Sequence, residues 1–155
     1  MKRVHSFMTD IGWVHVAEEN GAITEVTLPG EKAPAGEISK TPLLEKASFE
    51  ISEYLRGERY RFSLPLAPRG SDFAMMVWKE MLTIPYGEVR TYGELAEGIG
   101  RPGAARAVGQ ACNRNPISIL IPCHRVVGAG GKLTGYAGGL DLKQKLLELE
   151  EDAPL

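Results

Sequence analysis

The spacing of the apolar residues changes along the chain, and this change restricts the possible folds. Apolar and polar residues alternate over 12–17 and 22–28, as in half-buried strands, and a Glu-Asn-Gly turn at 19–21 separates them. Thr41-Pro42 then supplies an N-cap and a first helical residue, and apolar residues follow at helical spacing. We therefore predict an α+β protein whose small N-terminal α/β domain contains a short antiparallel sheet.

The later part of the chain has the pattern of helices and loops. Residues 65–70 are rich in Pro and Gly and predict a linker, which divides the chain into domains 1–66 and 67–155. Ser71 is the expected N-cap of the first helix of the second domain. The apolar positions expected on that helix are Phe73, Met76, Val77 and Leu82.

Two short helices are expected around a tight turn in this mostly helical domain. Thr91 caps a helix over 92–98, a Gly-Arg-Pro-Gly turn follows at 100–103, and a helix covers 104–113. This order is that of a helix-turn-helix, although a helical hairpin without a DNA role has the same pattern. Small residues would let the second helix approach a groove closely. The small and cationic residues of that helix and its end are Ala104, Ala105, Arg106, Ala107, Gly109 and Arg114.

Charge is unevenly distributed in a chain whose formal net charge is only -2. Residues 98–145 carry seven Lys or Arg and one Asp, whereas the first 97 residues carry 11 Lys or Arg and 15 Asp or Glu. A basic segment inside an acidic chain is expected for contact with nucleic acid, although solvated helix faces and loops produce the same pattern.

Composition narrows the class of protein further. A hydrophobic fraction of 43% with 25% charged residues is typical of a globular protein. No apolar run approaches the roughly 20 residues of a membrane helix, and the N-terminus lacks a secretory signal, so we expect a cytoplasmic protein without a membrane partner. Cys112 and Cys123 are the only cysteines, and together with three scattered histidines they form no tetrahedral zinc set. We expect neither a metal nor a cofactor.

An apolar run leads directly into the tetrapeptide Pro122-Cys123-His124-Arg125. A thiol becomes a good nucleophile when it is deprotonated, and a neighbouring histidine or cation favours the thiolate. A buried structural cysteine is the alternative interpretation, since cysteine is among the most buried residue types. We expect Cys112, which falls inside a predicted helix, to have that packing role.

The sequence from Ile121 to Val126 resembles the active-site motif of the O6-alkylguanine-DNA alkyltransferases, or methylated-DNA–protein-cysteine methyltransferases. The resemblance extends strongly over about 64–150 and only in outline over the first domain. Several motifs in one order and spacing make it specific. The further matching segments are Ile84-Pro85-Tyr86-Gly87-Glu88-Val89, Thr91-Tyr92, Ala104 to Gly109, Gly135 to Leu140 and Lys143 to Glu150.

The resemblance implies a catalytic role for five residues. Cys123 would be the nucleophile and permanent alkyl acceptor in a single-turnover transfer from O6-alkylguanine in DNA. His124 would act as the base through a water molecule, and Glu150 would orient its imidazole. Asn115 would tie the helix-turn-helix to the active-site turn. Tyr92 would donate its hydroxyl to the guanine ring as that ring becomes a leaving group.

The resemblance also implies how DNA is bound. A monomer would enter the minor groove of duplex DNA, and Arg106 would fill the gap left by the flipped base. O4-alkylthymine is a second candidate substrate. Thr91, Arg114 and Arg125 are expected to contact DNA, along with the small residues of the second helix. The residues expected to line the substrate pocket are Pro122, Val126, Tyr136, Ala137 and Gly138.

Three departures from the family pattern and two alternative functions follow from the same comparison. Ala137 stands where other members carry serine, which would alter the pocket wall. The chain also lacks both a second methyl-accepting domain and the zinc-binding residues of some animal members. Alkyltransferase-like damage sensors share this architecture but replace the cysteine, so Cys123 argues against that function. A transcription factor with a structural cysteine would instead bind specific sequences and have an unreactive thiol.

Overall fold

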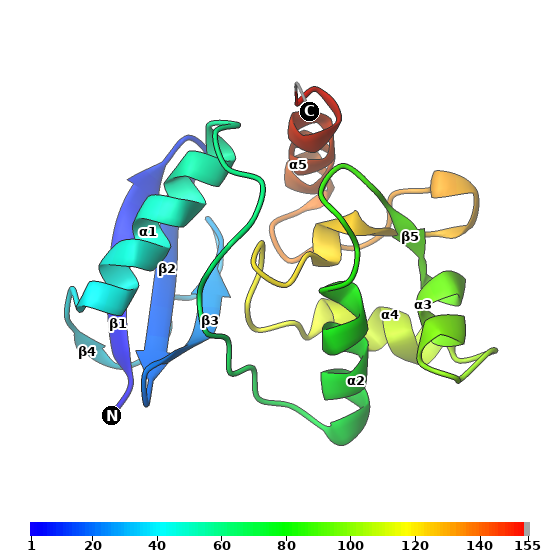
Figure 1. The fold of residues 1–155 in the computed structure, drawn as a ribbon, viewed down its shortest axis with the longest axis horizontal. Helices are drawn as coiled ribbons and strands as arrows, with labels where there is room; N and C mark the ends of the chain where they lie inside the picture. The colour runs from blue at the N-terminus through cyan, green and yellow to red at the C-terminus, as the bar shows by residue number, and fades with distance from the viewer. Residues whose placement is uncertain (154–155) are drawn as a thin grey trace. The chain divides into compact units, whose positions relative to one another are not determined.

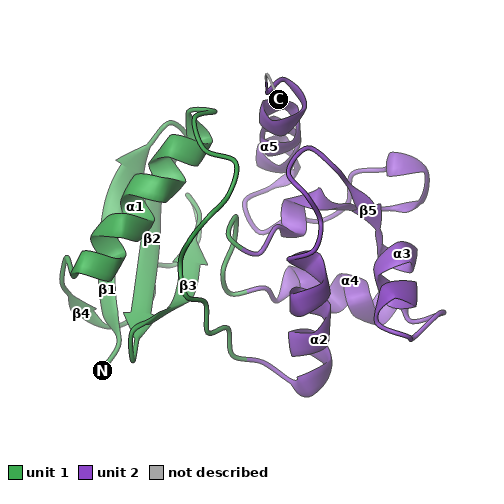
Figure 2. Cartoon of the chain, in the orientation of Figure 1, with its two compact units in different colours: residues 1–69, 116–120 green, residues 70–115, 121–155 purple. Residues whose placement is uncertain are grey.

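The computed structural model describes residues 1–153 and divides into two compact units (Figures 1 and 2). Unit 1 contains residues 1–69 and 116–120, and unit 2 contains 70–115 together with the described residues from 121 onward. The prediction of one boundary after residue 66 was therefore wrong for 67–69 and 116–120. These five later residues belong to unit 1 because their backbone pairs with a strand of its sheet.

Unit 1 is a four-stranded sheet covered by one helix. The strand order is β3 (Ala22–Thr27), β2 (Gly12–Glu19), β1 (Arg3–Thr9) and β4 (Glu37–Ile38), and only the β1–β4 pair is parallel. Helix α1 (Pro42–Leu55) packs on β1 and β2. The expected hairpin and helix are thus present, whereas β1 and β4 were missed. Strand β4 is two residues long and follows a segment rich in Pro and Gly, so it has no alternating pattern that would predict a strand.

The segment 116–120 crosses from unit 2 into the sheet region of unit 1 and back. The backbone amide of Val26 donates to the Pro116 carbonyl at 2.9 Å, and the Ser118 amide donates to the Val26 carbonyl at 3.3 Å. Ile117 is fully buried, and Ile119 has a φ of 73°, a left-handed conformation that β-branched residues rarely adopt. The run before Cys123 is therefore a core segment of unit 1 with a strained turn.

Unit 2 is mostly helical. Its helices are α2 (Asp72–Met81), α3 (Tyr92–Gly98), α4 (Ala105–Asn113) and α5 (Leu140–Glu151), with the 3-10 turns η1 (Cys123–Arg125) and η2 (Ala129–Gly131). Strands β5 (Arg90–Thr91) and β6 (Val126–Val127) form a short parallel pair. Helices α3 and α4 pack on each other and on α2, as the helix-turn-helix prediction requires. Thr91 caps α3 in a capping box with Glu94.

The buried face of α2 differs from the expected one. The helix buries Ala74, Val77, Trp78 and Met81. The indole nitrogen of Trp78 donates to the Ala111 carbonyl of α4 at 2.9 Å. Met76 and Leu82, two of the apolar positions expected on this helix, are 37% and 49% exposed. Trp78 is buried instead, because its ring packs between α2 and α4 and its indole nitrogen has a hydrogen-bond acceptor there.

The Ser71 hydroxyl stabilises the start of α2. Its side chain accepts from the Ala74 backbone amide at 3.1 Å, as an N-cap does. Replacement of Ser71 by alanine should lower the free energy of unfolding by about 1 kcal/mol, because that amide loses its partner. Denaturant unfolding measures this loss, and Ser71→Asp, which keeps an acceptor, should remain near wild type. Equal losses for both variants would contradict the cap.

Candidate active site

Cys123 lies on a short turn that is joined to the start of the helix-turn-helix. The backbone amide of Arg125 donates to the Pro122 carbonyl at 2.9 Å and closes η1 around the cysteine, which is 7% exposed. The next two residues form β6, where Val126 pairs with Arg90 and Val127 pairs with Thr91. Since Thr91 is the N-cap of α3, a single strand pair separates the cysteine turn from that helix.

The imidazole of His124 is bound to the carboxylate of Glu150. Nε2 of His124 lies 2.6 Å from Oε2 of Glu150, and both side chains are buried. Glu150 comes from the end of α5, and the backbone amide of Gly87 donates to its Oε1 at 3.0 Å. Gly87 has a φ of 82°, a conformation that glycine adopts without strain. The histidine ring is therefore held with Nδ1 as the nitrogen remote from the carboxylate.

Arg125 lies in this cluster, and its predicted contact with DNA was wrong. The guanidinium donates from Nε to Oε1 of Glu150 at 2.8 Å, from Nη2 to Oε2 at 3.1 Å, and from Nη1 to the Ile84 carbonyl at 2.8 Å. Its charge also lies over the Tyr86 ring, 5.6 Å from the centroid. The side chain is 8% exposed. It turns inward because the two carboxylate oxygens match its planar fork.

Burial and pairing fix the charges of the His124–Glu150–Arg125 cluster. Burial raises the pKa of Glu150, but its hydrogen bonds to His124 and Arg125 outweigh that effect and lower the pKa to about 2. Burial lowers the pKa of His124 and outweighs the opposite effect of Glu150. At neutral pH the cluster thus holds a carboxylate, a guanidinium and a neutral imidazole. A neutral imidazole is the form that accepts a proton.

Tyr92, Thr134 and Lys143 form a second cluster of hydrogen-bonded residues. The hydroxyls of Tyr92 and Thr134 are 2.6 Å apart, and Nζ of Lys143 donates to the Thr134 carbonyl at 2.9 Å. Burial raises the pKa of the Tyr92 phenol, which therefore keeps its proton at neutral pH, and lowers that of the fully buried Lys143. Thr134 was missed because an isolated threonine in a loop carries no pattern. Lys143 was counted only as one cation of a basic segment.

Cys112 lies at the end of α4, and Asn115 lies just beyond the helix. Nδ2 of Asn115 donates to the Ile121 carbonyl at 2.9 Å, which is a contact between the helix end and the cysteine turn. Cys112 is 6% exposed and lies 3.6 Å from the sulfur of Met81. Burial raises its pKa to about 12, so its thiol stays protonated and packs in the core.

Helix α4 has an outer face that differs sharply from its inner face. Val108, Ala111 and Cys112 are buried, whereas Arg106 and Ala107 are exposed. Arg114, directly after the helix, is also exposed. Ala104, Ala105 and Gly109 are half-buried, and because their side chains are small or absent, little projects from the helix surface beside Arg106.

The predicted pocket residues lie on both sides of the cysteine turn. Pro122 and Val126 are buried next to Cys123 in the sequence. Tyr136 meets His124 edge to face, with ring centroids 6.5 Å apart. Ala137 is exposed and Gly138 half-exposed in the loop before α5. The loop residue Tyr136 is thus brought to the imidazole, while Ala137 remains accessible to solvent.

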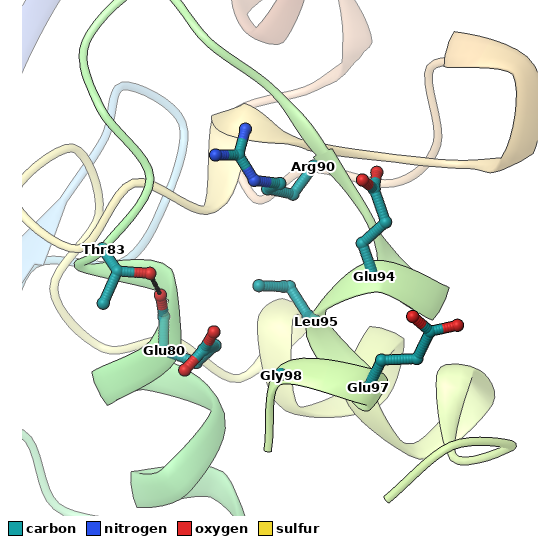
Figure 3. Close-up of a pocket in the computed structure, with 7 residues that line it drawn as sticks. All are labelled: Glu80, Thr83, Arg90, Glu94, Leu95, Glu97 and Gly98. Carbon is teal, nitrogen blue, oxygen red and sulfur yellow. Dashed lines mark hydrogen bonds between the residues drawn. The ribbon is translucent and has the colours of Figure 1, made fainter. Parts of the chain in front are cut away.

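A pocket of about 400 Å³ opens elsewhere on unit 2 (Figure 3). Residues from the end of α2, from β5 and from α3 line it, and Figure 3 shows the Arg90 and Glu94 side chains above Leu95. None of the residues that line this pocket is a cysteine, a histidine or any other predicted site residue. It is not a candidate for the nucleophile's substrate pocket. Its lining residues are Glu80, Thr83, Arg90, Glu94, Leu95, Glu97 and Gly98.

Membrane and metal features were searched in residues 1–153. Within that range no helix has both the length and the apolar character needed to cross a bilayer. The same residues contain no group of three or more His, Cys, Asp or Glu side chains placed to hold a metal ion.

The fold and the site together define a helix-turn-helix protein with a buried cysteine beside a histidine–glutamate pair. The family model of the 6-O-methylguanine DNA methyltransferase DNA-binding domain matches residues 72–152. A Methanosarcina acetivorans methylated-DNA–protein-cysteine methyltransferase is 47% identical over 148 residues, covering 93% of this chain and 95% of that protein. A Mycobacterium leprae protein of the same name is 43% identical over 154 residues, covering 97% and 93%.

The similarity extends to the fold of the whole chain. The crystal structure of Mycobacterium tuberculosis OGT in complex with DNA matches with a TM-score of 0.91 and 43% identity, covering 97% of this chain and 94% of that one. The chain belongs to the methylated-DNA–protein-cysteine methyltransferase family. The family resemblance and the α+β fold expected from the sequence are thus confirmed.

Proposed function

We propose that this protein repairs DNA by moving the alkyl group from O6 of a damaged guanine onto its own Cys123. The observation that carries the proposal is the buried Cys123 turn, with His124 bound to Glu150 at 2.6 Å, joined through the β5–β6 pair to the helix-turn-helix. The names of the relatives and the crystal structure of a similar protein with DNA support the same activity and DNA as the partner.

The transfer is a displacement at the alkyl carbon. The proton of Cys123 passes through a water molecule to His124, whose lowered pKa leaves the imidazole neutral and able to accept it. The charge of Glu150 stabilises the imidazolium that forms. The thiolate sulfur then bonds to the alkyl carbon, the bond from that carbon to O6 breaks, and the electron pair goes to the guanine. Tyr92 donates a hydrogen bond to the departing base.

Each molecule reacts once, because the product is a thioether. Nothing in the proposed step breaks the new carbon–sulfur bond, so the transfer is stoichiometric and irreversible. Asn115 supports this chemistry by holding the Ile121 carbonyl, and thereby the turn that carries the cysteine. O4-alkylthymine, which also presents an alkylated ring oxygen, is a second substrate within the proposal.

DNA binds to the outer face of α4. The protein acts on the DNA as a monomer. The low surface of Ala104, Ala105, Ala107 and Gly109 approaches the minor groove, and Arg114 contacts phosphate. Thr91, at the start of α3, lies at the same end of the motif as the cysteine turn. A target atom inside the stack requires base flipping, and Arg106 fills the gap.

Mass spectrometry of the intact protein tests the proposal. Incubation with duplex DNA that contains one O6-methylguanine should add one methylene mass, mapped by peptide sequencing to Cys123. Tight binding to the lesion without a mass gain would instead indicate a damage sensor. If the protein neither gained mass nor preferred the lesion, this result would contradict any role in alkylation repair.

Replacement of Arg106 by alanine should separate base flipping from chemistry. The reaction with duplex O6-methylguanine should slow at least about tenfold, since holding a base out of the stack costs a few kcal/mol. The reaction with the small molecule O6-benzylguanine needs no flipping and should change less than about twofold. Rate constants on the two substrates measure the difference. Arg101→Ala, which removes an exposed cation from the turn before α4, is the charge-matched control. Equal losses on both substrates would contradict the role of Arg106.

A further inference from the structure

Thr134 lies in the loop before α5 and makes two hydrogen bonds to different elements. Its hydroxyl lies 2.6 Å from the Tyr92 hydroxyl at the start of α3. Its backbone carbonyl accepts from the Lys143 ammonium in the first half of α5 at 2.9 Å. One residue thus connects the loop that carries Tyr136 both to the helix-turn-helix and to α5, all within unit 2.

The Lys143 bond fixes the backbone at Thr134. Lys143 is completely buried, so its ammonium depends on protein acceptors such as the Thr134 carbonyl. A carbonyl held in this way limits the positions that the attached side chain can reach. The hydroxyl of Thr134 is therefore presented to Tyr92 from an anchored part of the loop.

The Tyr92 ring is confined on another side by α4. A Cβ added at Gly109 would lie 3.7 Å from two ring carbons of Tyr92, so the ring lies against the helix backbone. With the ring held there, the remaining freedom of the phenol is mainly the direction of its O–H bond. That direction depends on whether its hydroxyl partner, Thr134, donates or accepts.

We infer that Thr134 is a positioning residue whose hydroxyl donates to the Tyr92 oxygen and so directs the phenol proton toward the base. The inference rests on the proposed function, in which Tyr92 donates to the leaving guanine. A phenol has one proton, so Tyr92 can give it to the base only if Thr134 is the donor in their mutual bond.

Substitution at Thr134 tests the inference while keeping the carbonyl that Lys143 binds. Thr134→Val has nearly the same shape and lacks the hydroxyl, whereas the control Thr134→Ser retains the hydroxyl. The second-order rate constant for methyl transfer from duplex DNA should fall about tenfold in Thr134→Val and stay within about threefold of wild type in Thr134→Ser.

A double-mutant cycle with Tyr92→Phe separates positioning from general loop packing. If Thr134 acts through the Tyr92 hydroxyl, Thr134→Val should cause almost no further loss once that hydroxyl is gone. An equal loss in the Tyr92→Phe background would overturn the inference, as would a wild-type rate in Thr134→Val. Thermal unfolding of each variant reports whether the fold persists.

The titration of Tyr92 gives a readout that does not depend on activity. In protein labelled at the tyrosine ζ carbon, the Tyr92 signal, assigned with Tyr92→Phe, should report a higher pKa in Thr134→Val than in wild type or Thr134→Ser. An unchanged pKa would overturn the inference even where rates fall. Absence of methyl transfer by the wild-type protein would instead contradict the proposed function, and the titration would still decide whether Thr134 donates to Tyr92.

Discussion

Replacing Cys123 by serine should abolish the mass gain after incubation with O6-methylguanine DNA. A serine hydroxyl keeps its proton at neutral pH much more strongly than a thiol, and the neighbouring neutral imidazole cannot make it a comparable nucleophile toward an alkyl carbon. We expect the transfer rate to fall by at least about 1,000-fold. Mass spectrometry of the intact protein and the residual O6-methylguanine in the DNA measure the two sides of the same reaction.

Cys112→Ser is the matched control, since it makes the same exchange at the other cysteine. Cys112 packs against Met81 and its pKa of about 12 leaves it protonated, so this variant should still accept one methyl group. Binding of the lesion should persist in Cys123→Ser, because α4 and Arg106 are unchanged. If Cys123→Ser still cleared the methyl group from DNA, Cys123 would not be the acceptor.

Local sequence patterns predicted those parts of the fold that depend on local interactions. The caps at Thr41, Ser71 and Thr91 all accept from the backbone amide three residues on, because an N-cap depends only on its own helix. The segment 116–120 was assigned to the wrong domain because its partner, Val26, lies about 90 residues earlier in the chain. A pairing over that distance leaves no local signal.

The same distinction explains the outcome at the site. Cys123 and His124 could be predicted as site residues because both belong to one motif of adjacent residues. The role predicted for Arg125 was wrong because an arginine beside a cysteine can face solvent or an interior carboxylate, and Glu150 lies 25 positions away. The hydroxyl pair of Tyr92 and Thr134 spans 42 positions, and its partners are common residue types. Only the folded backbone brings such groups together.

Replacing Glu150 by glutamine should destabilise unit 2 and slow the reaction together. The carboxylate receives donors from His124, Arg125 and the Gly87 amide, and its loss leaves the buried Arg125 charge without its counter-ion. Removing one partner of a buried pair costs several kcal/mol, and we expect about 3 kcal/mol here. The imidazole also loses the charge that stabilises its protonated form. Denaturant unfolding and single-turnover rates measure the two effects, and Glu148→Gln, an exposed change on the same helix, is the control.

The pH dependence of stability tests whether the Glu150 charge causes the loss of stability in Glu150→Gln. The pKa of Glu150 is about 2 in the folded protein and lies below its ordinary value of 4.5, so the unfolded chain takes up this proton first as the pH falls. The stabilisation is complete above about pH 5 and disappears between about pH 5 and pH 2. His124, whose pKa is also lowered, adds a loss in the same direction that begins near pH 6.5. Glu150→Gln should therefore keep the loss that begins near pH 6.5 and show a smaller loss below pH 5 than the wild-type protein. A variant with the full wild-type acid dependence would show that the stability of this cluster does not come from the Glu150 charge.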